Sequence, residues 1–156
     1  MTDMETTPTE WRRDGFTIST DSSRLDRPAM REFLAASYWS PGIPQEVLDR
    51  ALEGSLCFGL YDGERQIGFA RAITDRATFA YVADVYVLEE YRGQGLALWL
   101  MQTVMEHPQL QGLRRWMLLT RDAHSLYRKV GFVDVARPER IMEIARPDIY
   151  IEPDER

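Results

Sequence analysis

A strand, a glycine-bearing turn and a helix in the middle of the chain constrain the fold most. Residues 79–87 (FAYVADVYV) are apolar on both alternating faces except at Asp84, which indicates a central strand covered on both sides. A helix follows over residues 96–106, and its apolar positions recur at i, i+3, i+4, i+7 and i+8 from Leu96. With a further strand at residues 116–120, this segment predicts a right-handed parallel strand-helix-strand unit.

The flanking sequence alternates between helical and strand patterns. Asp26 and Pro28 predict the start of one helix, and Pro44 and Gly54 predict the start and the end of a second. The other expected elements are a strand at 16–19, a hairpin of 56–61 and 66–74, a short helix at 124–130, and last strands at 133–135 and 140–144. This order predicts an α/β (α+β) fold with a mixed sheet.

Length, charge and cysteine content narrow the class of protein. We expect residues 1–156 to form a single domain with frayed ends at 1–14 and 152–156. The net charge of −6 argues against a nucleic-acid-coating protein. The apolar run at 96–101 is too short to span a bilayer, and the N-terminus lacks a signal region, so we expect a cytoplasmic protein without membrane contact. Cys57 is the one cysteine, which excludes an internal disulfide and a CxxC site, and we expect no metal.

The glycine-bearing turn predicts an anion site. Glycines can adopt backbone angles closed to other residues, and N–H groups at a helix start have no partner within the helix. These groups, together with the helix dipole, suit a pyrophosphate. The residues concerned are Arg92, Gly93, Gln94, Gly95, Leu96 and Ala97. A P-loop and a Rossmann fingerprint are disfavoured, because GxxxxGK[ST] is absent and Leu98 stands where a third glycine belongs. A plain turn and a domain that binds NAD or ATP remain open.

Two segments of the sequence resemble one known family. Residues 92–97 (RGQGLA) fit the R/Q-x-x-G-x-G/A signature of the GCN5-related N-acetyltransferase (GNAT) family. Residues 123–132 (AHSLYRKVGF) are similar to that family's A-x-x-L-Y-x-x-x-G-F segment, and the two motifs stand in the family's order. The resemblance implies a mixed, mostly antiparallel sheet of six to seven strands flanked by helices, with a splay between the fourth and fifth strands.

The same resemblance implies acetyl-CoA as the co-substrate. Its pyrophosphate would sit on the amides of the glycine-bearing turn. Its pantetheine arm would pair like an extra strand with the exposed edge at Val85, Tyr86 and Val87, since a splayed strand has unpaired main-chain groups. Thr120 stands where many relatives carry an asparagine that helps to hold the coenzyme, and its hydroxyl can offer a hydrogen bond.

Two residues are candidates for proton transfer. Tyr127 matches the family's tyrosine acid, which protonates the departing sulfur; a helix tyrosine packed in the core is the alternative. Asp84 is the candidate base, because it is a carboxylate in an otherwise apolar strand. Asp84 could instead bind a cationic amine, hydrogen-bond a backbone bulge, or pair with an arginine.

An aromatic pair and the overall resemblance complete the functional prediction. Tyr38 and Trp39 end the first helix, where the resemblance implies the border of the acceptor pocket; core packing is the alternative.

The resemblance implies an N-acetyltransferase that moves an acetyl group from acetyl-CoA to the amine of a small molecule or peptide, by direct attack in a ternary complex. A homodimer is an option. The alternative is a catalytically silent sensor or partner module that binds CoA or acetyl-CoA.

Overall fold

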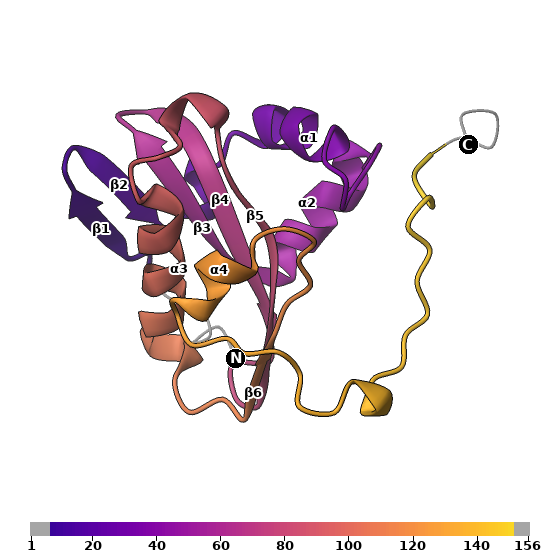
Figure 1. Cartoon of the computed structure of the whole chain (residues 1–156). Helices are drawn as coiled ribbons and strands as arrows, with labels where there is room; N and C mark the ends of the chain where they lie inside the picture. Colours follow the sequence, from indigo (N-terminus) through magenta and orange to yellow (C-terminus); the bar gives the residue numbers. More distant parts are fainter. Residues whose placement is uncertain (1–6, 152–156) are drawn as a thin grey trace.

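A six-stranded sheet forms the centre of the protein in the computed structural model, which describes residues 7–151 (Figure 1). The strands lie in chain order across the sheet: β1 (Glu10–Arg13), β2 (Phe16–Ser19), β3 (Ser55–Asp62), β4 (Arg65–Thr74), β5 (Phe79–Val87) and β6 (Arg115–Met117). Neighbouring strands are antiparallel except β5 and β6, which are parallel. The predicted mixed, mostly antiparallel sheet is confirmed.

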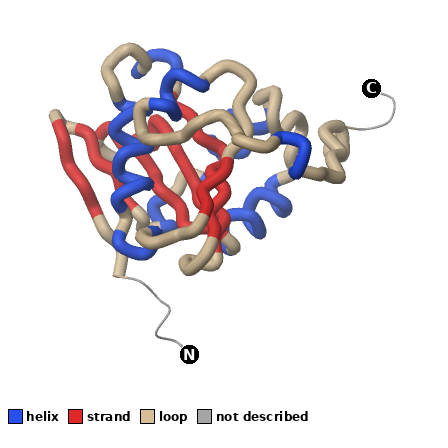
Figure 2. The backbone as a smooth tube through the Cα atoms, turned by 60° about the horizontal axis from the view of Figure 1, so that its bottom comes forward, coloured by secondary structure: helices blue, strands red, loops and turns tan. Residues whose placement is uncertain are grey.

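Helices cover both faces of the sheet (Figure 2). One face packs on α1 (Arg27–Ala35) and α2 (Gln45–Glu53), and the other packs on α3 (Leu96–Glu106), which is followed by α4 (His124–Arg128). Short 3-10 turns occupy Ser22–Arg24, Glu89–Tyr91, Pro108–Leu110 and Pro138–Arg140. No helix of the described part of the chain is long and apolar enough to cross a membrane.

The predicted helix starts follow from local capping. The Asp26 carboxylate accepts a hydrogen bond from the main-chain N–H of Ala29, 3.2 Å away, which satisfies a free donor of the first turn of α1. Pro44 precedes α2 and Gly54 ends it, as the sequence predicts. The two helices pack together because their apolar faces share one buried cluster with the sheet, which contains Met30 and Leu48.

A β-bulge in β5 changes which residues share a face. Strict alternation along the strand predicts that Ala80 and Val82 point to one face of the sheet and that Val85 and Val87 point to the other. The structure instead places all four toward α3 and α4. Pairing shifts between Phe69↔Tyr86 and Arg71↔Ala83, and Asp84 takes the left-handed φ of 55°. Because the bulge inserts one residue, the strand changes face at that point.

The sheet opens between β5 and β6. The two strands pair only from Phe79↔Arg115 to Tyr81↔Met117. From Val82 onward, no described strand pairs with this edge of β5. The predicted splay between the fourth and fifth strands is therefore present, here numbered β5 and β6 because β1 precedes them, and the parallel strand-helix-strand unit is confirmed. The strand expected at 116–120 is shorter, since pairing ends at Met117.

Both ends of the described chain differ from expectation. Residues 10–13, expected within a frayed lead-in, form β1, because a turn with positive φ at Asp14 and Gly15 allows a hairpin with β2. The Trp11 ring also packs on Phe58. The strands expected at 133–135 and 140–144 are not formed within residues 7–151, and that segment leaves the sheet. The outermost expected frayed residues, 1–6 and 152–156, lie outside the described residues.

Candidate active site

An open cleft lies where β5 and β6 diverge. Its volume is about 1330 Å³. The end of β5, the start of α3, the loop after β6, Tyr127 of α4 and the segment after α1 line it. The cleft therefore brings together residues that are distant in the sequence, from Phe33 to Tyr127. Of the predicted site residues, those that line it are Tyr38, Trp39, Asp84, Val85, Tyr86, Val87, Arg92, Ala97, Thr120 and Tyr127.

The glycine-bearing turn presents an open helix start. Gly93 and Gly95 have φ values of 82° and 77°, which L side chains rarely adopt. Gly95 is the N-cap of α3, and within the described residues no side chain caps that end. The first N–H groups of α3 have no partner within the helix, and no acidic side chain stands in its first turn. This end of α3 thus carries the partial positive charge and the free donors that an anion requires.

Not every residue of the turn faces the cleft. Leu96 is the first residue of α3, and its side chain is buried in the core, so only its main chain can contribute to an anion site. The Gln94 side-chain amide donates to the carbonyl of Tyr91, 3.2 Å away, on the exposed surface. Gly93 and Gly95 do not line the cleft with atoms of their own, and a Cβ at either position would meet open space. Their role in the structure is to set the backbone course.

Arg92 ties the turn to the end of β5. Its Nε donates to the carbonyl of Val87 at 2.9 Å. The main-chain N–H of Leu88 donates to Ile67 of β4. Since successive residues of a strand direct their peptide groups to opposite sides, Val87 and Val85 face the gap. The Arg92 contact occupies the Val87 carbonyl and leaves the Val87 N–H directed at the cleft.

Tyr86 belongs to the other side of the strand. Its carbonyl oxygen would lie only 2.7 Å from a Cβ on Gly68, so its main chain faces β4 rather than the gap. Its ring stacks on Phe33, with 3.9 Å between ring centroids. The predicted edge consists of Val85, Tyr86 and Val87. Of these, Tyr86 borders the cleft with its side chain rather than with its main chain.

Tyr127 enters the cleft from α4. It is 9% exposed and shares a small core cluster with Val82 and Met101. Burial raises its pKa to about 12, so the hydroxyl is protonated at neutral pH. Within the described residues no hydrogen bond to this hydroxyl is formed. Thr120 Oγ1 accepts from the main-chain N–H of Ala123 at 3.0 Å, and this bond holds the start of α4.

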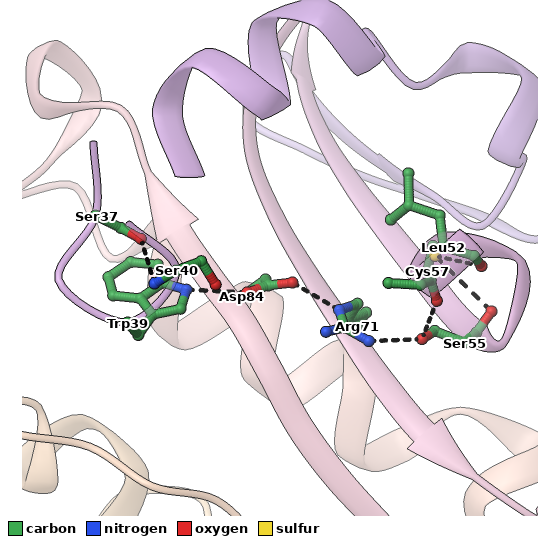
Figure 3. A network of polar contacts seen from close by, with 9 residues as sticks. Ser37, Trp39, Ser40, Leu52, Ser55, Cys57, Arg71 and Asp84 are labelled. Carbon is green, nitrogen blue, oxygen red and sulfur yellow. Dashed lines mark hydrogen bonds and ion pairs between the residues drawn. The ribbon is translucent and has the colours of Figure 1, made fainter. Parts of the chain in front are cut away.

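Asp84 is the centre of a buried polar network (Figure 3). One carboxylate oxygen accepts from Arg71 Nε at 2.6 Å and the other accepts from Trp39 Nε1 at 2.9 Å. Arg71 also donates from Nη1 to Ser55 Oγ at 3.0 Å. The side chains of Asp84 and Arg71 are only 4% and 14% exposed. These contacts agree with one alternative from the sequence, an aspartate that pairs with an arginine.

The segment after α1 reaches across the cleft to the loop after β6. The Tyr38 hydroxyl accepts from the main-chain N–H of Arg121 at 3.2 Å, and the Arg121 guanidinium lies 3.8 Å from the Tyr38 ring centroid. Trp39 lies edge-on to Tyr38 and both rings are partly exposed, so this pair is not simple core packing.

Sequence reasoning missed Arg71 and Arg121 as residues of the cleft. Arg71 carries the same signal as Asp84, a charge in an otherwise apolar strand, and two such charges on neighbouring strands suggest a pair. Arg121 gives no comparable signal. Among the described residues, no group of three or more His, Cys, Asp or Glu side chains could hold a metal ion.

Comparison with known proteins assigns the family. The sequence profile of the acetyltransferase (GNAT) family matches residues 11–132, which is most of the chain. The chain belongs to the GNAT family. A Gibberella zeae protein that is assigned as an acetyltransferase is 36% identical to this GNAT protein, over 80% of the chain and 82% of the relative.

Solved structures agree with this assignment. A Xanthomonas campestris protein assigned to the GNAT family superposes with a TM-score of 0.86 and 46% identity, over 88% of this chain and 97% of that one. A GNAT acetyltransferase from Elizabethkingia anophelis, solved with acetyl-CoA bound, shares the fold with a TM-score of 0.60 and 18% identity, over 78% of each chain. The ribosomal-protein-S18-alanine N-acetyltransferase of Escherichia coli also shares it, with a TM-score of 0.63 and 21% identity, over 78% and 79%.

Proposed function

We propose that this GNAT protein transfers an acetyl group from acetyl-CoA to an amine by direct attack in a ternary complex. One observation carries the proposal: the unpaired end of β5, the open start of α3 and the side chain of Tyr127 all border one cleft. An Elizabethkingia protein of the same fold has acetyl-CoA bound, and the Escherichia coli neighbour is named for an alanine acceptor on a ribosomal protein. These names support the donor and the class of acceptor.

The main chain of the cleft suits the two polar parts of the coenzyme. The free N–H groups at the start of α3 would take the pyrophosphate, with Arg92 adding a fixed positive charge. The peptide groups of Val85 and Val87 that face the gap would pair with the amides of the pantetheine arm. Thr120 keeps a hydroxyl proton to donate, because its oxygen is the acceptor toward Ala123.

Tyr127 would act as the acid. Acetyl-CoA supplies an acetyl thioester, whose C–S bond breaks as the amine nitrogen bonds to the carbonyl carbon. Tyr127 donates its hydroxyl proton to the departing sulfur and later regains one from water. Its pKa of about 12, raised by burial, keeps that proton on the oxygen at neutral pH. The N–H of Val87 would polarise the thioester carbonyl.

The proton of the attacking amine needs a separate route. Asp84 accepts hydrogen bonds at both carboxylate oxygens, from Arg71 and Trp39, so direct abstraction by Asp84 would disturb a buried ion pair. We infer that this proton leaves through water in the open cleft, which Asp84 and Asp122 both line. Asp84 would then be a positioning residue, because its carboxylate holds Trp39 beside the proposed acceptor site.

The acceptor amine would contact the aromatic pair after α1. The Arg121 guanidinium already lies over the Tyr38 ring, so an acceptor cation would contact the exposed Trp39 ring of the pair. An acceptor that carries an ammonium group fits it, whether a small molecule or the end of a peptide.

Two measurements test the proposal. Acetyl-CoA should raise the melting temperature, while NAD and ATP at equal concentration should not. Thiol release from acetyl-CoA should then appear with at least one member of a panel of amines and peptides. No stabilisation at saturating acetyl-CoA would refute the donor. Stabilisation without thiol release across the panel would favour the alternative, a coenzyme-binding sensor.

A further inference from the structure

The acceptor side of the cleft contains a guanidinium with unused hydrogen-bond donors. Arg71 lines the cleft from β4; its Nε donates to Asp84 and its Nη1 donates to Ser55 Oγ (Figure 3). An arginine side chain carries five N–H donors, so donors remain after these two bonds. Within the described chain Nη2 makes no hydrogen bond, and the fully buried side-chain atoms without a partner are Tyr61 Oη and His107 Nε2. Nη2 is therefore open to the cleft.

A tyrosine hydroxyl stands next to this guanidinium. Arg71 pairs with Ala83 across β4 and β5, and Tyr81 stands two residues before Ala83, which is the diagonal position on the same face. Long and aromatic side chains reach one another from such positions. Tyr81 also lines the cleft, and among the described residues its hydroxyl has no hydrogen-bond partner and is not fully buried. Burial raises the pKa of Tyr81, so this hydroxyl keeps its proton at neutral pH and can donate it.

This wall of the cleft offers donors but no free carboxylate. Both oxygens of Asp84 already accept hydrogen bonds, one from Arg71 and one from Trp39. The other acidic side chain that lines the cleft is Asp122, which is exposed on the loop after β6 and adjoins Arg121. An anion at the wall formed by β4 and β5 would thus meet unused N–H and O–H groups, whereas a cation would meet only an occupied carboxylate.

The chemistry of the wall selects a monoanion. Part of the Arg71 charge is neutralised by Asp84, which suits a carboxylate better than a phosphate dianion. Since Asp84 and Ser55 fix the guanidinium from two sides, Nη2 is held in one direction, and a planar carboxylate could place one oxygen on Nη2 and the other on the Tyr81 hydroxyl. Arg71 and Tyr81 lie before the bulge of β5, whereas the start of α3 follows the strand, so this site is separate from the one proposed for the pyrophosphate.

We propose that the acceptor carries a carboxylate as well as the amine that is acetylated, and that Arg71 and Tyr81 bind this carboxylate; the inference rests on the proposed function. The acceptor class is then an amino acid or another small amino-carboxylic acid, rather than a simple amine or a polyamine. The exposed Trp39 ring on the same side of the cleft would contact the rest of the acceptor. The transfer is as described above: the nitrogen gains the acetyl group and CoA leaves as the thiol.

Matched pairs of acceptors test this substrate class. Each α- or ω-amino acid of a panel is compared with its own carboxamide, by thiol release at saturating acetyl-CoA. We expect kcat/KM to be about 10- to 100-fold higher for the carboxylate, because hydrogen bonds to a charged group are strong ones. The amine of the carboxamide lacks the neighbouring negative charge and is more often neutral, so amine reactivity alone would give the opposite order. Equal values, or higher values for the carboxamides, would overturn the proposal.

Variants locate the site. Tyr81→Phe removes one hydroxyl and should lower kcat/KM for the carboxylates about tenfold, with little change for the carboxamides. Arg71→Lys keeps a positive charge beside Asp84 but lacks Nη2, and should also reduce the preference; circular dichroism checks that it folds. Tyr61→Phe is the matched control, because it removes a tyrosine hydroxyl that is buried and does not line the cleft. A preference that is unchanged in both Tyr81→Phe and Arg71→Lys would refute the assignment.

Calorimetry tests the carboxylate site apart from the transfer reaction. With CoA in place of acetyl-CoA no transfer occurs, and the preferred amino acid should bind more tightly than its carboxamide to the wild type but not to Tyr81→Phe. Thiol release without a preference for carboxylates would leave the proposed function intact and refute the site. If no amine releases thiol, the proposed function fails and calorimetry alone decides the site: binding that does not depend on the carboxylate, or no binding of any amino acid, would overturn it.

Discussion

Asp84→Asn should lower the stability of the protein strongly, because it leaves the Arg71 guanidinium without a counter-charge. The two side chains are 4% and 14% exposed and their atoms lie 2.6 Å apart. Removing one partner of a buried pair costs about 3–5 kcal/mol. Asparagine keeps the size of the side chain and tolerates the left-handed φ of 55° at this position, so backbone strain should contribute little to the loss of stability. In a domain of this size about 1 kcal/mol shifts the melting temperature by about 2–4 °C, which gives a loss of roughly 6–20 °C.

Thermal unfolding monitored by circular dichroism measures this effect. Glu90→Gln is the matched control, because it breaks the Arg65–Glu90 pair of 2.8 Å, whose side chains are 57% and 59% exposed. The control should lower the melting temperature far less than Asp84→Asn does, since water screens an exposed pair. Arg71→Met combined with Asp84→Asn should be less destabilised than Asp84→Asn alone, because no charge is left buried. Equal losses in Asp84→Asn and Glu90→Gln would refute the reasoning.

Three further predictions concern the cleft. Tyr127→Phe should reduce kcat by about 10²–10⁴-fold and change the dissociation constant of acetyl-CoA less than about threefold; unchanged kcat in steady-state kinetics would remove Tyr127 as the acid. Gly95→Ala should cost about 1–2 kcal/mol of stability because of its φ of 77°, and should weaken acetyl-CoA binding in calorimetry; full retention of both would show that the turn does not need glycine. The difference in absorbance at 295 nm between wild type and Tyr127→Phe should titrate near pH 12 rather than near pH 10. The pKa of Tyr127 is higher in the folded than in the unfolded protein, so its stabilising contribution is complete below about pH 10 and is lost as the pH rises toward 12. A titration midpoint near pH 10 would contradict the burial of Tyr127.

The elements that depend on local signals could be predicted from the sequence. Asp26 and Pro44 mark the starts of α1 and α2, because capping acts within one helical turn. The bounds of β5 and the start of α3 also agree with prediction, since alternating apolar residues and the glycines at 93 and 95 act over a few positions. The cleft between β5 and β6 was predicted through the family motifs, not through periodicity.

The features that depend on distant residues could not be predicted in this way. The bulge at Asp84 requires the register of β4 against β5, which the sequence of β5 alone does not specify. Pairing of Asp84 with Arg71 and Trp39 joins three segments, so the sequence could offer an arginine partner as an alternative to the base but could not identify which arginine. Residues 140–144 have a strand pattern, but a strand forms only where a neighbouring strand pairs with it, and the local pattern does not specify such a partner.

The ion pair with Arg71 gives a structural reason for the charge of Asp84 in an apolar strand, and this reason does not require Asp84 to be the base. A left-handed conformation costs about 1–2 kcal/mol in a residue with a side chain, less for aspartate, and the Arg71 ion pair holds Asp84 there. The resulting bulge orients Val85 and Val87, whose peptide groups face the gap proposed for the coenzyme. The other carboxylate oxygen accepts a hydrogen bond from Trp39, 45 positions earlier, in the segment proposed for the acceptor. One buried carboxylate thus links the strand edge proposed for the coenzyme to the segment proposed for the acceptor, and we expect loss of either hydrogen bond to disturb both.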